Sequence, residues 1–246
     1  MHTVTSMRKT QVGAICLSII ILTLSNLGAT DAQYKGFVSI ETKHLHIIYE
    51  PDVQEAAFEV ASFGDEVYEE LKEALEHNGE KKVPVVITGR SAWANGYFAP
   101  FPSRIHLFVT SDDALFLGHR SSSWLYSLFT HELTHYLHLT SRVGFARFLT
   151  PLFGPEVPNM NTVLMSGWWI EGITTNTETL FASGGRGDNE RFDMMVKASL
   201  LRGEEIWSLR QGAYSSILPP SGRIYLTGYV MVDYIIENYG ISAFNE

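Results

Sequence analysis

A mostly apolar run at residues 124–139 carries the pattern His-Glu-x-x-His at residues 131–135. On an α-helix, residues four positions apart lie one above the other on the same face. His131 and His135 can therefore bind one zinc ion, and Glu132 can reach a water molecule at the metal. The pattern predicts a helix built around a zinc site of the kind that hydrolases use.

A second element downstream, Trp168-Trp169-Ile170-Glu171-Gly172, offers Glu171 as a third ligand. Two imidazoles and one carboxylate leave the fourth tetrahedral position open for water, which a catalytic zinc ion requires. The single cysteine, Cys16, lies far from the pattern, so composition excludes a structural zinc site built from cysteines. The alternative for Glu171 is a carboxylate near the start of a helix, where the helix dipole stabilises it.

Together these segments resemble the gluzincin clan of metallopeptidases, typified by thermolysin and aminopeptidase N. In aminopeptidase-like members the third zinc ligand lies in a Trp-x-x-Glu-Gly segment, and another glutamate follows seven residues later. Trp168, Glu171, Gly172 and Glu178 fit this pattern. The resemblance implies a zincin-like (gluzincin) architecture and a Zn2+ cofactor held by the two histidines and Glu171.

Within this clan the chain looks most like the peptidase-MA-like domain of bacterial envelope proteins, which is often fused to a Tol-type β-propeller. The resembling segments are a strand at residues 37–49, a turn at residues 94–97, and a late helix that begins near Tyr225 and ends at Tyr239-Gly240. No propeller sequence follows. We therefore expect a stand-alone domain or a chain truncated before a C-terminal domain, and we favour truncation.

The resemblance also implies roles for individual side chains. Glu132 would take the proton of the attacking water and return it to the leaving amine; an exposed helical glutamate is the alternative. A tyrosine well after the third ligand stabilises the oxyanion in related aminopeptidases, and Tyr225 and Tyr229 are the candidates, Tyr225 first. Packing is the alternative for both. Glu178 can orient a zinc-binding histidine through its other ring nitrogen. His138 is interpreted as pocket lining or surface and not as a ligand.

The N-terminus has the pattern of a secretory signal peptide at residues 1–32. Arg8 and Lys9 precede an apolar run at residues 12–24, and small residues approach the expected cleavage site. This run is shorter than the roughly 20 residues that span a bilayer, so a cleaved signal is favoured over a permanent anchor. We expect a secreted or periplasmic protein whose zincin-like domain occupies residues 33–246.

Charge excludes one class of partner. The net charge of −9 becomes −10 without the signal peptide, which carries two basic residues and one acidic residue. Nucleic acid is a poor partner because no run of Lys and Arg is present to neutralise phosphates. Anionic membrane surfaces are disfavoured likewise, and a membrane is expected as a partner only if the signal stays uncleaved.

Three functional hypotheses follow. The first is a secreted zinc-dependent peptidase that acts on a peptide or protein substrate. The alternative, from a different class, is a cell-envelope scaffold or assembly module that keeps the zinc-binding fold, active or not, and binds an envelope protein partner, although a binding module has no need of Glu132. The third is an acidic, zinc-free interaction domain, which stoichiometric metal would exclude. No acidic signature of exopeptidases precedes His131, which slightly favours an endopeptidase, and the substrate stays open.

The pattern along the chain predicts an α+β fold in which a small mixed sheet precedes a mostly helical lobe. Strands are expected at residues 37–49, 83–88 and 104–110, the last two lying on either side of a turn at Asn95-Gly96. A helix is expected from Pro51 to about Leu75. In gluzincins the sheet edge lines the cleft, so the resemblance implies this role for residues 97–109.

Two later segments have no regular period. Residues 142–167 are apolar but contain three prolines, so they predict a lid, an apolar substrate wall or a loop packed on the helical lobe. A membrane-facing surface is a fourth option for this segment. Residues 183–188, which contain Arg-Gly-Asp, predict a turn between two helices and not an adhesion motif.

Overall fold

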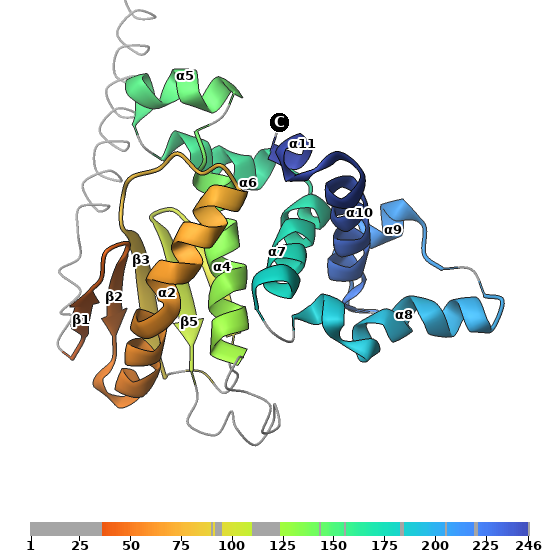
Figure 1. The fold of residues 1–246 in the computed structure, drawn as a ribbon, viewed down its shortest axis with the longest axis horizontal. Coiled ribbons are helices and arrows are strands. Elements are labelled where there is room, and N and C mark those ends of the chain that lie inside the picture. Colours follow the sequence, from red (N-terminus) through yellow and green to blue (C-terminus); the bar gives the residue numbers. More distant parts are fainter. Residues whose placement is uncertain are drawn as a thin grey trace, which may run out of the picture. The chain divides into compact units, whose positions relative to one another are not determined.

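The computed structural model describes residues 36–89, 91, 95–109, 124–142, 144–154, 156–182, 185–204, 206–218 and 221–245 (Figure 1). The chain divides after Phe37, and every element below belongs to the unit Val38–Glu246. The predicted signal peptide lies outside the described residues. Within the described part, no helix has both the length and the apolar character needed to cross a membrane.

The sheet is mixed, as the sequence predicted, but it has five strands where three were expected. The prediction of a single strand at residues 37–49 is wrong, because this segment forms two strands that pair antiparallel. The five strands are β1 (Val38–Glu41), β2 (Leu45–Tyr49), β3 (Val83–Thr88), β4 (Asn95–Pro100) and β5 (Ser103–Phe108), in the order β1-β2-β3-β5-β4. The three inner strands β2, β3 and β5 are parallel, and the outer strands β1 and β4 pair antiparallel with their neighbours. The edge strand β4 is the one that reaches the site described below.

The prediction of a turn at Asn95-Gly96 is wrong. Both residues lie in β4, where Asn95 pairs with Phe108 and Gly96 pairs with Leu107, and the chain turns at Phe101-Pro102 instead. Tertiary packing explains the glycine, because a side chain at residue 96 would press against Glu132 of the neighbouring helix. Gly96 allows close approach between a strand and a helix in place of a turn.

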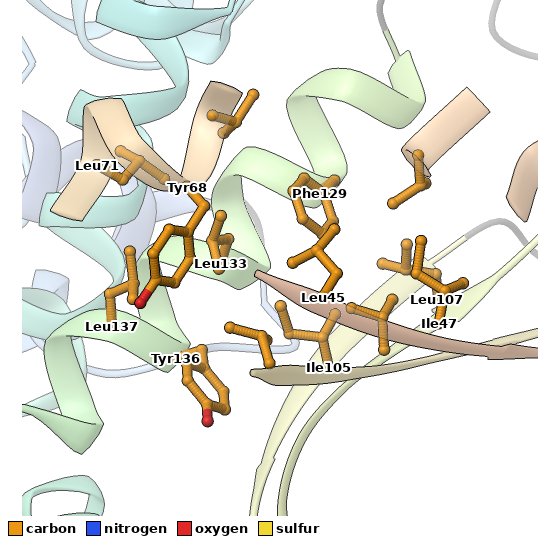
Figure 2. Close-up of a cluster of buried hydrophobic side chains, with 14 of the residues drawn as sticks. Leu45, Ile47, Tyr68, Leu71, Ile105, Leu107, Phe129, Leu133, Tyr136 and Leu137 are labelled. Atoms are coloured by element: carbon orange, nitrogen blue, oxygen red, sulfur yellow. The ribbon is translucent and has the colours of Figure 1, made fainter. Parts of the chain in front are cut away.

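Two long helices cover one face of the sheet. A short 3-10 helix, η1 (Pro51–Val53), leads into α2 (Gln54–Ala74), and α4 (Trp124–Thr140) lies beside α2. Figure 2 shows Leu45, Ile47, Ile105 and Leu107 of the strands against Phe129, Leu133 and Leu137 of α4 and Leu71 of α2. Alternate residues of β2 are buried, as the period of a strand requires. Each such side chain contributes about 1.5–3 kcal/mol when fully buried.

The described residues after β5 are mostly helical, as predicted. They form α4, α5 (Gly144–Phe153), η2 (Val157–Met160), α6 (Asn161–Leu164), α7 (Gly167–Phe181), η3 (Arg186–Asp188), α8 (Glu190–Leu201), α9 (Leu209–Gly212), α10 (Arg223–Tyr239) and α11 (Ile241–Asn245) (Figure 1). Segment 142–167 is broken into three short helices, and η3 forms part of the predicted turn between α7 and α8. The sheet thus precedes a helical part that carries all three predicted ligands.

Helices α7 and α10 are in contact through a glycine pair. A Cβ atom on Gly172 would lie 2.5 Å from the carbonyl oxygen of Gly228, and one on Gly228 would lie 2.8 Å from the Cα atom of Gly172. Only glycine lets two helix backbones approach so closely. Glu171 and Tyr225 stand one residue and three residues from this contact, so it sets their separation.

Candidate metal centre

The three predicted ligands converge. Helix α4 supplies His131 and His135, and α7 supplies Glu171. The Oε2 atom of Glu171 lies 3.5 Å from Nε2 of His131 and 3.6 Å from Nε2 of His135, and the three ligand atoms all lie within 4.8 Å of one another. Among the residues that the structure describes, no other group of three His, Cys, Asp or Glu side chains converges in this way.

These separations fit a metal ion better than hydrogen bonds. Nitrogen and oxygen atoms that share a proton lie about 2.7–3.2 Å apart. Ligand atoms at about 2.1 Å from a tetrahedral zinc ion are about 3.4 Å apart, close to the two separations that Glu171 makes. Oε2 of Glu171 is buried and has no hydrogen-bond partner among the described residues. The donor set of two imidazoles and one carboxylate therefore suits zinc.

Glu178 holds the first histidine. Nδ1 of His131 lies 2.8 Å from Oε2 of Glu178, and both side chains are buried. A carboxylate accepts, so Nδ1 donates to Glu178, and Nε2 is the ring atom that faces the ligand group. The hydroxyls of Thr134 and Thr177, 2.8 Å apart, join α4 to α7 close by. By contrast, Nδ1 of His135 is buried with no partner in the described part of the chain.

The charges in the group are coupled. Burial lowers the pKa of His131, but contacts with the Glu171 and Glu178 carboxylates outweigh it and raise the pKa to about 9. Burial raises the pKa of Glu171, but the two histidines outweigh it and hold the pKa well below its usual range. Without a metal, a proton therefore takes the place of the cation among these groups, and a metal ion must displace it.

Glu132 lies beside the ligands without joining them. Its Oε2 atom is buried and has no hydrogen-bond partner among the described residues. The backbone of β4 lies against the same side chain, because a Cβ atom on Gly96 would be only 2.9 Å from Cγ of Glu132. The side chain is thus packed against β4 while its buried oxygen stays available to a water molecule or substrate.

A cavity of about 320 Å³ opens over these residues. Its walls come from β4, α4, α6, α7, η3 and α10, and the lining residues are Asn95, Gly96, Tyr97, Phe98, Leu128, His131, Glu132, His135, Leu139, Thr162, Gly167, Ile170, Glu171, Arg186 and Tyr225. The edge strand reaches the cavity with residues 95–98. Strand β5 has neighbours on both sides, so the edge role predicted for residues 97–109 applies to β4 alone.

The structure separates the two tyrosine candidates. Tyr225 lines the cavity, and its ring lies 6.4 Å from that of His131, centroid to centroid. Tyr229 does not line it; its ring packs 6.1 Å from that of Phe192, and its hydroxyl lies beside Gly187. Its prediction as a catalytic residue therefore lacks structural support. His138 does not join the ligand group either, and its ring packs against Phe244 of α11 at 5.4 Å.

Arg186 lines the cavity, although the sequence predicted only a turn there. Its guanidinium carbon lies 4.4 Å from the centroid of the Tyr225 ring, and its Nε atom lies 3.4 Å from Oε1 of Glu178. Burial raises the pKa of Tyr225, the Glu171 carboxylate adds to this, and the charge of Arg186 opposes it. The one sequence signal was an arginine placed between two glycines soon after the ligand helix.

No protein-family model matches the chain, and no curated protein matches it. The relation to the gluzincins therefore stays a prediction from the motifs.

Proposed function

We propose that this protein is a secreted or periplasmic zinc-dependent peptidase with a zincin-like architecture, which hydrolyses peptide bonds by attack of water. The observation that carries the proposal is the convergence of His131, His135 and Glu171 on one point, with the Glu132 carboxylate unengaged beside them. A closed structural site would have a fourth protein ligand, and the described residues supply only three.

Each residue of the site has its own role in the proposed reaction. His131, His135 and Glu171 would hold the zinc ion, which when bound lowers the pKa of a water molecule and polarises a carbonyl group. Glu132 accepts the proton of the attacking water and returns it to the leaving nitrogen. Glu178 keeps His131 in the tautomer that directs Nε2 to the metal.

Two further features support a peptide as substrate. Edge strand β4 borders the cavity, and a free strand edge binds an extended backbone with little dependence on side chains. Tyr225, on the wall of the same cavity, can donate its hydroxyl hydrogen to the oxyanion that forms at the carbonyl.

The test is zinc content and peptide hydrolysis, measured together on protein purified without a metal-affinity step. Wild type is expected to hold close to one zinc ion per chain and to cleave a mixed peptide library. Glu171→Ala is expected to lose the metal, whereas Glu132→Gln is expected to keep it and lose cleavage. Glu190→Gln, an exposed glutamate of α8, serves as the matched control.

The outcomes separate the first two functional hypotheses. Zinc binding without cleavage of any peptide in the library would favour the envelope scaffold that keeps the fold. Absence of zinc from wild type at neutral pH would overturn both hypotheses.

A further inference from the structure

The turn between α7 and α8 is built into the site and does not simply connect two helices. We propose that Arg186, between Gly185 and Gly187, is a positioning residue that holds the Tyr225 ring in place beside the metal ligands. This inference rests on the proposed function, because it assigns Arg186 a role in the same site. It gives the Arg-Gly-Asp segment a purpose that the sequence did not reveal.

The turn is anchored to the last turn of α7 by its backbone. The N–H of Arg186 donates to Oε1 of Glu178 at 3.1 Å, and the N–H of Gly187 donates to Oγ1 of Thr179 at 3.0 Å. A Cβ atom on Gly185 would collide with the backbone of Glu178 and Thr179, and one on Gly187 would lie 2.5 Å from the Tyr229 hydroxyl. Both flanking residues must therefore be glycine, and the position of Arg186 is fixed.

The guanidinium group lies between an acid and an aromatic ring. Its Nε atom faces Oε1 of Glu178, and its central carbon lies over the Tyr225 ring at 4.4 Å from the centroid. Nη1 is buried and has no hydrogen-bond acceptor among the described residues, so the ring contact and Glu178 are the partners that the structure shows for this group. The guanidinium group of Arg186 thus packs on the Tyr225 ring while its backbone is bound to α7.

Arg186 and His131 are two neighbours of the Tyr225 ring, the first 4.4 Å and the second 6.4 Å from its centroid. The Tyr225 hydroxyl makes no hydrogen bond with the residues that the structure describes. A continuous path instead leads from His131 through Glu178 and Arg186 to Tyr225, across α4, α7, η3 and α10. Arg186 therefore links the metal ligand His131 to Tyr225, the proposed oxyanion donor.

Arg186→Met keeps an unbranched apolar stem but removes the planar cation. The backbone N–H to Glu178 remains, so zinc affinity is expected to change by less than about 3-fold. We expect kcat to fall about 10-fold with little change in KM. A misplaced donor stabilises the transition state less, whereas the binding of substrate does not depend on it. The kcat of Arg186→Lys is expected to lie between those of wild type and Arg186→Met, because lysine keeps the positive charge but not the planar guanidinium group.

The decisive experiment is a double-mutant cycle with Tyr225→Phe. If Arg186 acts through the tyrosine hydroxyl, Arg186→Met or Arg186→Lys causes no further loss of kcat in the Tyr225→Phe background. Fully additive losses would overturn the proposal, as would loss of zinc from both Arg186 variants. Arg191→Met, an exposed arginine of α8, is the control and is expected to leave kcat unchanged in both backgrounds.

A second measurement keeps this test independent of peptidase activity. Acetohydroxamate binds an open zinc site and leaves an oxygen beside any nearby donor, so its affinity for the zinc-loaded protein can be measured in the same cycle. We expect each single variant to bind it about 5-fold more weakly and the double variant no more weakly than Tyr225→Phe. If wild type cleaves no peptide, the proposed function fails, and this cycle still decides the role of Arg186.

Discussion

Replacing Gly96 by alanine tests whether Glu132 performs the proton transfer. The new methyl carbon would lie 2.9 Å from Cγ and 3.2 Å from Oε1 of Glu132, whereas ordinary contacts are 3.4–4 Å. The carboxylate must therefore move by roughly 0.5–1 Å, since it is the flexible partner. A displacement of about 1 Å in a catalytic group can reduce the rate about 100-fold, so we expect kcat/KM to fall by 10- to 100-fold.

Stability should change far less than activity. Overpacking costs about 1–3 kcal/mol, and about 0.5–1 kcal/mol of this is returned because alanine is favoured over glycine in a strand. The net loss in free energy of unfolding is then at most about 2.5 kcal/mol. The ligands His131, His135 and Glu171 are not touched by the new methyl group, so zinc content should stay that of wild type.

The assay compares kcat/KM, zinc content and urea denaturation for wild type, Gly96→Ala and Gly222→Ala. Gly222 is the control because a Cβ atom there meets only Met195, at 3.6 Å, an ordinary contact. Wild-type activity in Gly96→Ala would show that the position of the Glu132 carboxylate does not govern the rate. Loss of zinc in that variant would refute the claim that Glu132 can move without disturbing the metal ligands.

Three further predictions follow from contacts around the site. Gly228→Ala places a methyl group against the carbonyl oxygen of Trp168 and should separate α7 from α10, destabilising the protein by about 1–3 kcal/mol in urea denaturation and weakening zinc binding. Glu178→Gln should weaken zinc binding about 10- to 100-fold in competition with a chelator, because His131 loses its charged acceptor, whereas Glu190→Gln should not. Burial lowers the pKa of His77 to about 4 in the folded chain. As pH falls, His77 therefore becomes protonated near pH 6.5 in the unfolded chain but only near pH 4 in the folded chain. Stability should therefore fall by roughly 3 kcal/mol as pH drops through this window, at about 1.4 kcal/mol per pKa unit, and His77→Gln should remove this part of the pH dependence of unfolding.

The parts of the fold that could be predicted are those that depend on local spacing. The pattern at residues 131–135 requires a helix to bring its two histidines together, and α4 (Trp124–Thr140) is that helix. Strand β2 was expected because its segment is rich in β-branched and aromatic residues, and the structure shows it alternating buried and half-buried residues. Glu171 could be found because its tryptophan and glycine neighbours form a motif, although its distance from α4 along the chain says nothing about geometry.

The misplaced turn and the choice between tyrosines depended on contacts distant in sequence. Asn95-Gly96 has the composition of a turn, but the approach of Glu132 from α4 overrides that preference and places the glycine in a strand. Tyr225 and Tyr229 are four positions apart on one helix, so the period of the helix does not separate them. Only the place where α10 crosses α7 decides which one reaches the cavity.

That crossing also explains why Arg186 could not be assigned from sequence. The glycine pair Gly172 and Gly228 brings α10 against α7, so Tyr225 arrives beside the ligands and next to the end of α7. In the turn that follows α7, the guanidinium group of Arg186 then lies between Glu178 and the Tyr225 ring. If this order of causes is right, Gly228→Ala should disturb Tyr225 and Arg186 together. Its effect on kcat should then be much smaller in the Arg186→Met background than in wild type.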